Sequence, residues 1–126
     1  MKSLETPLHK VQGFGASHSG TGHFWRQRVT AIALIPLGLW FAYAVMGLAG
    51  TNEVAALRFL AHPWNAILMA AFVITMLYHM SLGLQVIIDD YVHTTGMKIL
   101  FLLLVRFITL ATMSTCVFSL FRIAAL

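Results

Sequence analysis

The chain has 126 residues, of which 60% are hydrophobic and 10% charged, whereas soluble globular domains have about 45–50% apolar and about 25% charged residues. This composition excludes an ordinary water-soluble domain, because the apolar residues also lie in long blocks rather than in short periodic stripes. The net charge of +4 comes from scattered basic residues, which excludes a nucleic-acid-binding face, and the single Cys116 excludes an internal disulfide and iron–sulfur clusters.

Residues 1–28 are polar and rich in glycine, serine and histidine. Such a segment cannot bury a core of its own, so we predict a flexible arm over residues 1–28, followed by one membrane domain over residues 29–126. The arm has no long apolar stretch of the kind that forms the core of a secretory signal peptide. We therefore expect the arm to stay on the cytoplasmic side.

Three apolar segments follow, at residues 29–48, 66–88 and 99–120. Each meets the requirement of about 20 residues for a helix that crosses a hydrocarbon core of about 30 Å. Backbone groups in lipid must form their hydrogen bonds within the segment, so each segment is predicted to be an α-helix. The predicted fold is therefore an all-α integral membrane protein with three transmembrane helices, the first of which is kinked or loosened at Pro36.

Two connections join the predicted spans. Residues 49–65 contain a turn-forming His-Pro-Trp sequence and are predicted to form a short interfacial loop. Residues 89–98 are predicted to form a second loop, in which Asp89 is a solvated charge.

The distribution of basic residues predicts the orientation, because lysine and arginine are in excess on the cytoplasmic side of membrane proteins. The region before the first span contains Lys2, Lys10, Arg26 and Arg28, whereas the next connection contains only Arg58. We therefore expect a multi-pass protein of a bacterial inner (cytoplasmic) membrane, with its N-terminus in the cytoplasm and its C-terminus in the periplasm.

His79 is the clearest candidate for function. It lies about 13 Å from the nearer end of the second predicted helix, too deep for its ring to reach the lipid headgroups. An ionisable side chain at that depth usually faces the interior of the helix bundle and is a functional candidate. The helical period places Phe72, His79, Gly83, Val86 and Asp90 on one face. Two interpretations remain open: the neutral imidazole binds haem iron, or it hydrogen-bonds a neighbouring helix while Gly83 is a packing notch.

The stretch His79-Met-Ser-Leu-Gly-Leu-Gln-Val-Ile-Ile-Asp-Asp-Tyr91 resembles the motif of one family of respiratory membrane anchors. That family is the hydrophobic membrane anchor of succinate dehydrogenase. Its pattern is a histidine, a glycine four residues later, a Gln-Val pair, and an Asp-Tyr pair eleven and twelve residues after the histidine. The sequence Arg28-Val-Thr-Ala-Ile also resembles the start of the family's first helix, and the three-span layout agrees over the rest of the chain.

The resemblance implies cofactors and roles for individual residues. His79 is expected to be one axial ligand of a haem b, with the other ligand supplied by a second membrane subunit. Asp90 and Tyr91 are expected at a ubiquinone site near the cytoplasmic surface, where the Tyr91 hydroxyl bonds a quinone carbonyl. Arg28 is expected near the haem propionates, which a guanidinium binds well. His23 is a further candidate for the propionates.

The resemblance also implies a function, that of the membrane anchor of succinate dehydrogenase (succinate:ubiquinone oxidoreductase). The expected partners are a flavoprotein subunit, an iron–sulfur subunit and a second cytochrome b membrane anchor, and the chain itself is expected to be non-catalytic. Arg106 is expected to extend from the third helix toward the cytoplasmic surface. The alternatives are a haem-free structural subunit and the anchor of a related fumarate reductase; a small transporter is disfavoured because no acidic residue lies in mid-span.

Overall fold

The computed structural model describes residues 6–9 and 18–125. A single helical turn at residues 7–9 is followed by four helices: α2 (His18–Leu48), α3 (Glu53–Ala61), α4 (Pro63–Tyr91) and α5 (Thr95–Ala124). The described residues form no strand. α2, α4 and α5 are each long and apolar enough to cross a membrane. The prediction of an all-α protein with three transmembrane helices is confirmed.

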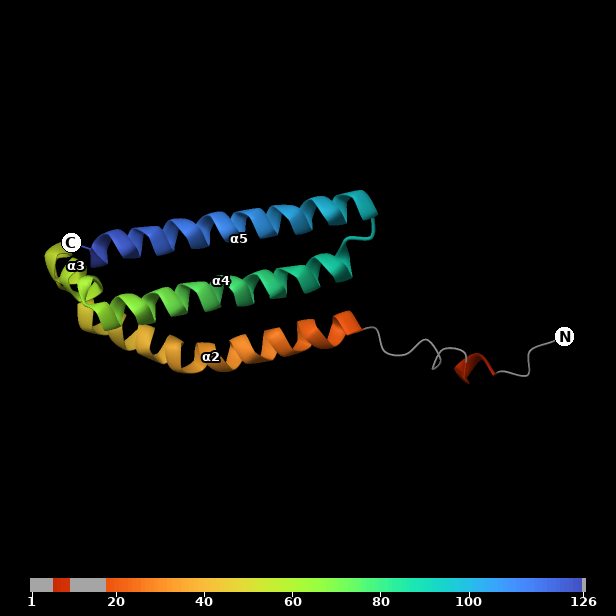
Figure 1. Ribbon diagram of the computed structural model, residues 1–126, viewed down its shortest axis with the longest axis horizontal. Helices are drawn as coiled ribbons and strands as arrows, with labels where there is room; N and C mark the ends of the chain where they lie inside the picture. The colour runs from red at the N-terminus through yellow and green to blue at the C-terminus, as the bar shows by residue number, and fades with distance from the viewer. Residues whose placement is uncertain (1–5, 10–17, 126) are drawn as a thin grey trace.

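The three long helices lie side by side, and α4 contacts both α2 and α5 (Figure 1). The beginning of α2 lies at the same end of the bundle as the connection from α4 to α5 (Figure 1). We call this the α4–α5 end. α3 and the C-terminus lie at the opposite end (Figure 1). α4 is therefore antiparallel to both of its neighbours, and residues early in α2 are level with residues late in α4.

α2 differs from its prediction at its beginning. The helix starts at His18 rather than at Val29, so the prediction of a flexible arm is wrong for residues 18–28, while residues 1–5 and 10–17 lie outside the described part of the chain. Glycine disfavours a helix by only about 1 kcal/mol, and contacts with α4 offset this cost: the side chains of Arg26 and Gln27 both reach α4. The helix runs through Pro36 without interruption.

α3 corrects the prediction of a loop over residues 49–65. The side chain of Asn52 caps the helix by accepting a hydrogen bond of 2.9 Å from the backbone N–H of Ala55. The ring of Phe59 stacks on Trp40 of α2, with ring centroids 6.3 Å apart, and the amide of Asn65 donates to the Phe59 carbonyl at 2.9 Å. A helix of nine residues is marginal alone, so these contacts stabilise it.

The connection between α4 and α5 is shorter than predicted, because α4 continues to Tyr91 and α5 begins at Thr95. Asp89 therefore lies in the last helical turn of α4 rather than in a loop, and its side chain remains exposed. Its carboxylate forms an ion pair with Lys98 of α5, with Oδ1 and Nζ 2.8 Å apart. The pair joins the two helices across their connection.

We expect Asp89→Asn to have only a small effect on stability. The side chains of Asp89 and Lys98 are 43% and 34% exposed, and an exposed ion pair contributes at most about 1 kcal/mol. The melting temperature of the assembled complex should fall slightly in Asp89→Asn. The double variant Asp89→Asn/Lys98→Gln should melt at the same temperature as Asp89→Asn alone, since both changes remove the same ion pair. A large loss of stability, or a change in quinone kinetics, would show that Asp89 has another role.

Few side chains are buried within the described part of the chain. Phe72, Leu77 and Leu82 of α4 are buried, and Phe72 stacks on Phe41 of α2 with ring centroids 4.5 Å apart. Most large apolar side chains of the three spans are exposed, including Leu39 at 69%. Such a surface is stable only against lipid or other membrane helices. The chain is therefore a multi-pass membrane protein whose helices expose apolar surface to lipid and to other membrane helices.

Candidate functional site

His79 lies on the face of α4 that packs against α2. Its ring is partly buried, and its Nδ1 is 2.8 Å from the hydroxyl oxygen of Thr30 in α2. Phe72, two turns earlier on the same face, stacks on α2 as well. The face that the helical period defines is therefore the seam between α2 and α4, and the imidazole points to the neighbouring helix. In the described residues, the Nε2 atom of His79 forms no hydrogen bond.

Beside His79 the seam opens into a hollow of about 430 Å³, which we call the α2–α4 hollow. It is lined by Gly20, His23, Phe24, Gln27, Arg28, Gly83 and Val86. Gly83 lies one helical turn after His79, and Gln27 lies almost one turn before Thr30, so these lining residues are displaced from the His79–Thr30 contact by about 6 Å or less along the helix axes. From there the hollow continues toward the α4–α5 end.

Gly83 is not required for the packing of α2 on α4. A Cβ atom built at this position would meet only the Gln27 side chain, at 3.9 Å, which is an ordinary contact. The interpretation of Gly83 as a packing notch for another helix of the same chain therefore finds no support. The space above its backbone belongs to the α2–α4 hollow.

Two polar atoms at this hollow are buried without a hydrogen-bond partner among the described residues: Nε2 of His23 and Oε1 of Gln27. A buried polar atom without a partner is unfavourable by about 1–3 kcal/mol, and such atoms in a native site call for a partner from outside the chain. The hollow therefore suits a ligand that has both apolar and polar parts.

Arg28 lies at the same hollow and is exposed. Its guanidinium lies over the Phe24 ring, 5.0 Å from the ring centroid, which orients the group. It has no carboxylate partner among the residues that the structure describes, where the single ion pair is that of Asp89. The structure thus places Arg28 and His23 together with Gly83, which follows His79 by one turn.

Asp90 and Tyr91 lie at the end of α4 and line none of the hollows described here. Tyr91 is 78% exposed. Consecutive residues of a helix point about 100° apart, so Asp90 faces the same way as His79 whereas Tyr91 points to a different side. Among the residues that the structure describes, Asp90 and Tyr91 therefore do not share a pocket.

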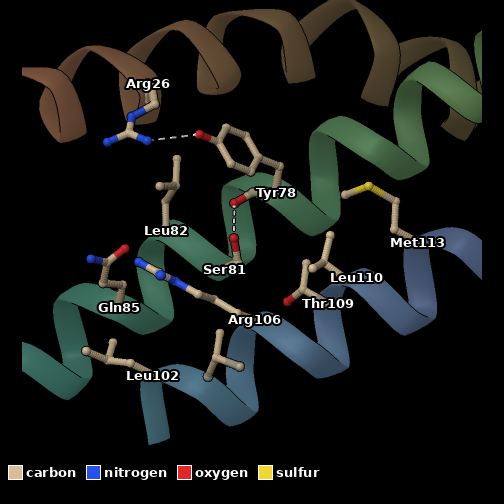
Figure 2. Close-up of a pocket in the computed structure, with 11 residues that line it drawn as sticks. Arg26, Tyr78, Ser81, Leu82, Gln85, Leu102, Arg106, Thr109, Leu110 and Met113 are labelled. Carbon is tan, nitrogen blue, oxygen red and sulfur yellow. Dashed lines mark hydrogen bonds between the residues drawn. The ribbon is translucent and has the colours of Figure 1, made fainter. Parts of the chain in front are cut away.

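A second hollow, of about 280 Å³, lies between α2, α4 and α5 (Figure 2). Arg26 of α2 donates to the hydroxyl of Tyr78 across it, at 3.5 Å. The side chain of Arg106 extends along α5 toward Gln85 of α4 (Figure 2), which is the direction of the α4–α5 end. Arg106 therefore lines a different hollow from Arg28.

Sequence reasoning missed Thr30 and Gln27, which bring α2 to the site. A signal was present, because Thr30 is a polar residue just inside an apolar segment and Gln27 lies one turn before it. The pairing of Thr30 with His79 depends, however, on the register in which α2 packs against α4, which the sequence does not give. In the described chain no three His, Cys, Asp or Glu side chains form a cluster for a bare metal ion.

The sequence is similar to known proteins of one family. Residues 2–113 match the family model described as succinate dehydrogenase/fumarate reductase transmembrane subunit. The succinate dehydrogenase hydrophobic membrane anchor subunit of Rickettsia bellii is 30% identical over 112 residues, which cover 89% of this chain and 90% of the relative. The protein of the same description from Paracoccus denitrificans is 35% identical over 86 residues, covering 68% and 67%.

The succinate dehydrogenase membrane anchor subunit of Reclinomonas americana is 31% identical over 107 residues, which cover 82% of this chain and 89% of that protein. No solved structure shows significant similarity to the chain. The match to the family model extends over all three long helices as far as Met113 in α5. The chain therefore belongs to the family of succinate dehydrogenase/fumarate reductase transmembrane subunits, in which these relatives are membrane anchors of succinate dehydrogenase.

Proposed function

We propose that this chain anchors succinate dehydrogenase in the membrane, supplies one axial ligand of a haem b through His79, and forms part of the ubiquinone site. Electrons from succinate oxidation would pass through this assembly to the quinone pool. The observation that carries the proposal is the position of His79 beside a hollow whose polar atoms, on His23 and Gln27, are buried without partners among the described residues. The iron–sulfur clusters would belong to partner subunits, since the one cysteine of this chain cannot hold them.

The residues at the α2–α4 hollow fit a haem. His79, one helical turn from the hollow, would provide an imidazole ligand, and Gly83 and Val86 would provide a small apolar surface for the edge of a flat ring. Arg28, with His23 and Gln27, would bind the propionates through charge-assisted and amide hydrogen bonds. When bound, the haem supplies an iron that can accept and release one electron. The second axial ligand would come from a second cytochrome b membrane anchor, because His79 is one ligand only.

Asp90 and Tyr91 support the proposal of a quinone site at the α4–α5 end. A quinone travels in lipid, and its reduction takes up two protons, so its site needs hydrogen-bonding groups at the membrane boundary. A phenol and a carboxylate at the end of a transmembrane helix have this chemistry. Tyr91 is 78% exposed, so its hydroxyl is available to a pocket that partner subunits complete.

We expect Tyr91→Phe to slow ubiquinone reduction by about 2- to 12-fold, because it removes a hydrogen bond of about 0.5–1.5 kcal/mol. Haem content and succinate oxidation with an artificial acceptor should not change, since the Tyr91 hydroxyl belongs neither to the proposed haem site nor to the site of succinate oxidation in the soluble subunits. The measurement is steady-state kinetics of the purified complex with a soluble ubiquinone. Tyr43→Phe is the matched control. Tyr43 is similarly exposed, at 74%, but it lies in the C-terminal half of α2, away from the α4–α5 end. Equal quinone kinetics in the two variants would contradict the role of Tyr91.

The proposed partners are the flavoprotein and iron–sulfur subunits and the second cytochrome b anchor. We place the soluble subunits at the α4–α5 end, which would face the cytoplasm of a bacterium, with the C-terminus in the periplasm. This end carries Arg26, Arg28 and Lys98, whereas the opposite end carries Arg58 and Arg122, and the excess of basic residues supports that orientation.

An optical spectrum of the purified assembly, combined with identification of its subunits by mass spectrometry, tests the proposal. We expect a dithionite-reduced spectrum with a b-type haem band and three partner subunits that co-purify with this chain. A haem-free structural subunit predicts the same partners with no such band. Rates of succinate oxidation and of fumarate reduction by the same preparation distinguish a succinate dehydrogenase from a fumarate reductase.

A further inference from the structure

We propose that Thr30 is a positioning residue for His79: its hydroxyl accepts a hydrogen bond from the Nδ1–H group and so leaves the Nε2 atom as the bare nitrogen that faces a metal. The inference rests on the proposed ligation of haem by His79. It concerns a residue of α2 that does not line the α2–α4 hollow. The contact that carries it is the distance of 2.8 Å between Thr30 Oγ1 and His79 Nδ1.

The direction of this hydrogen bond follows from the other contacts of the hydroxyl. Thr30 Oγ1 lies 2.7 Å from the backbone carbonyl oxygen of Arg26 and 3.1 Å from that of Gln27. A carbonyl oxygen only accepts, and a hydroxyl has one proton to donate. When that proton is directed to the helix backbone, the lone pairs of Oγ1 face His79. The hydroxyl is then an acceptor, and the proton of the shared bond belongs to Nδ1.

This assignment selects one tautomer of the imidazole. A neutral histidine carries one N–H group, so a proton on Nδ1 leaves a lone pair on Nε2. The opposite tautomer would need the Thr30 proton for Nδ1, and the hydroxyl would then lose its bond of 2.7 Å to the Arg26 carbonyl. Both groups keep their hydrogen bonds only when Nε2 is bare. Iron and other metals bind that form of the ring.

The contact also fixes the orientation of the ring. Threonine is branched at Cβ and has few side-chain rotamers in a helix, and the bond to its own backbone holds the hydroxyl further. The ring of His79 is thus attached to α2 as well as to α4. Hydrogen bonding of Nδ1–H increases the electron donation of the other nitrogen. Thr30 should therefore stabilise ferric over ferrous iron at this ligand.

Thr30→Val tests the inference, because valine keeps the shape of threonine and removes the hydroxyl. In the purified complex we expect haem to remain bound, its midpoint potential to shift to a more positive value, and the electron paramagnetic resonance spectrum of the oxidised haem to change. Thr30→Ser should restore both properties, since serine provides the same acceptor. A purely structural role of Thr30 would change stability without a change in potential that serine restores.

Thr115→Val is the matched control. The hydroxyl of Thr115 in α5 also donates to the carbonyl four residues before it, at 2.8 Å, but it forms no hydrogen bond with a histidine of the described chain. In the Thr115→Val complex, the haem midpoint potential and the electron paramagnetic resonance spectrum should equal those of the unchanged complex. Equal potentials and spectra in Thr30→Val and in the unchanged complex would overturn the inference. Absence of haem from the unchanged complex would instead overturn the proposed function, so the two failures are distinguishable.

A second measurement decides the case in which the Thr30→Val complex does not assemble. The full unchanged chain, labelled with ¹⁵N-histidine and reconstituted in lipid without haem, reports its tautomers through the ring ¹⁵N chemical shifts. The signals of His79 are identified by their loss in His79→Ala. We expect the tautomer with the proton on Nδ1. A proton on Nε2 would overturn the inference.

Discussion

Replacement of His79 by alanine is expected to remove the b-type haem band from the reduced spectrum of the assembled complex. The methyl group of alanine cannot bind iron, and His79 is the one histidine of the described chain that the seam between α2 and α4 holds deep in a span. If His79 holds the haem iron as proposed, the variant would lack one of the residues that bind it, and the band would be lost with that ligand. We therefore expect the low-spin signal to be lost, and haem content per complex to fall about tenfold or more, as for a lost bond of more than about 1.4 kcal/mol.

His93→Ala is the control for this prediction. His93 is an exposed histidine of the connection after α4, and its Nδ1 contacts only the backbone oxygen of Tyr91, at 3.1 Å. Its haem band should be unchanged. In both variants, succinate oxidation with an artificial acceptor shows whether the soluble subunits remain bound. A full haem band in His79→Ala would contradict ligation by this residue.

Replacement of Gly83 by leucine is expected to exclude haem while the chain still folds. Gly83 has little around it within the described chain, since a Cβ would meet only one atom, at 3.9 Å. A leucine side chain would instead extend into the α2–α4 hollow, where the edge of the haem would lie. Overpacking of a site costs about 1–3 kcal/mol, which corresponds to about a 5- to 150-fold weaker binding of haem. Haem content per complex and the helical circular dichroism of the purified chain are the measurements.

Two further variants separate exclusion of haem from damage to the helix. Gly83→Ala adds only the Cβ atom, for which the chain has room, so most of the haem should remain. Gly38→Leu makes the same change in α2 at a glycine with no atom within 4 Å of an added Cβ, and it should leave haem content unchanged. Normal haem content in Gly83→Leu would show that the macrocycle does not approach this face of α4.

The three spans could be predicted from the sequence because each is a long apolar block, and lipid permits few structures other than helices. The residues at which the helices begin and end could not be predicted in this way. A helix that continues beyond the hydrocarbon core contains polar residues, as residues 18–28 of α2 do, and composition then no longer distinguishes helix from loop. α3 was missed because its stability comes from a cap at Asn52 and a stack of Phe59 on Trp40, which are tertiary features.

The candidate site could be predicted in part. The helical period places His79 and Gly83 on one face, and the structure puts that face against α2. The period does not show which residues of another helix lie opposite, so Thr30 and Gln27 required the structure. The same period separates Asp90 from Tyr91 by about 100°, although the family resemblance implies that both belong to one ubiquinone site. A quinone site that includes both needs surfaces from other subunits.

The chain would contribute only half of the haem site that we propose. Its polar atoms at the α2–α4 hollow have no partners among the described residues, and the apolar faces of its spans are exposed. Both features are expected of a protein that folds against lipid and then docks with a second membrane protein. The exposed faces alone do not identify that protein, and the second cytochrome b anchor is the partner that we propose.

An electron cryomicroscopy map of the complete complex tests the central claim most directly. We predict density for a porphyrin between this chain and a second membrane subunit, with iron bound by Nε2 of His79, Nδ1 of the same ring at Thr30, and the propionates near Arg28. A map in which the imidazole turns toward acyl chains, or in which the iron takes both axial ligands from other residues, would contradict the role of His79.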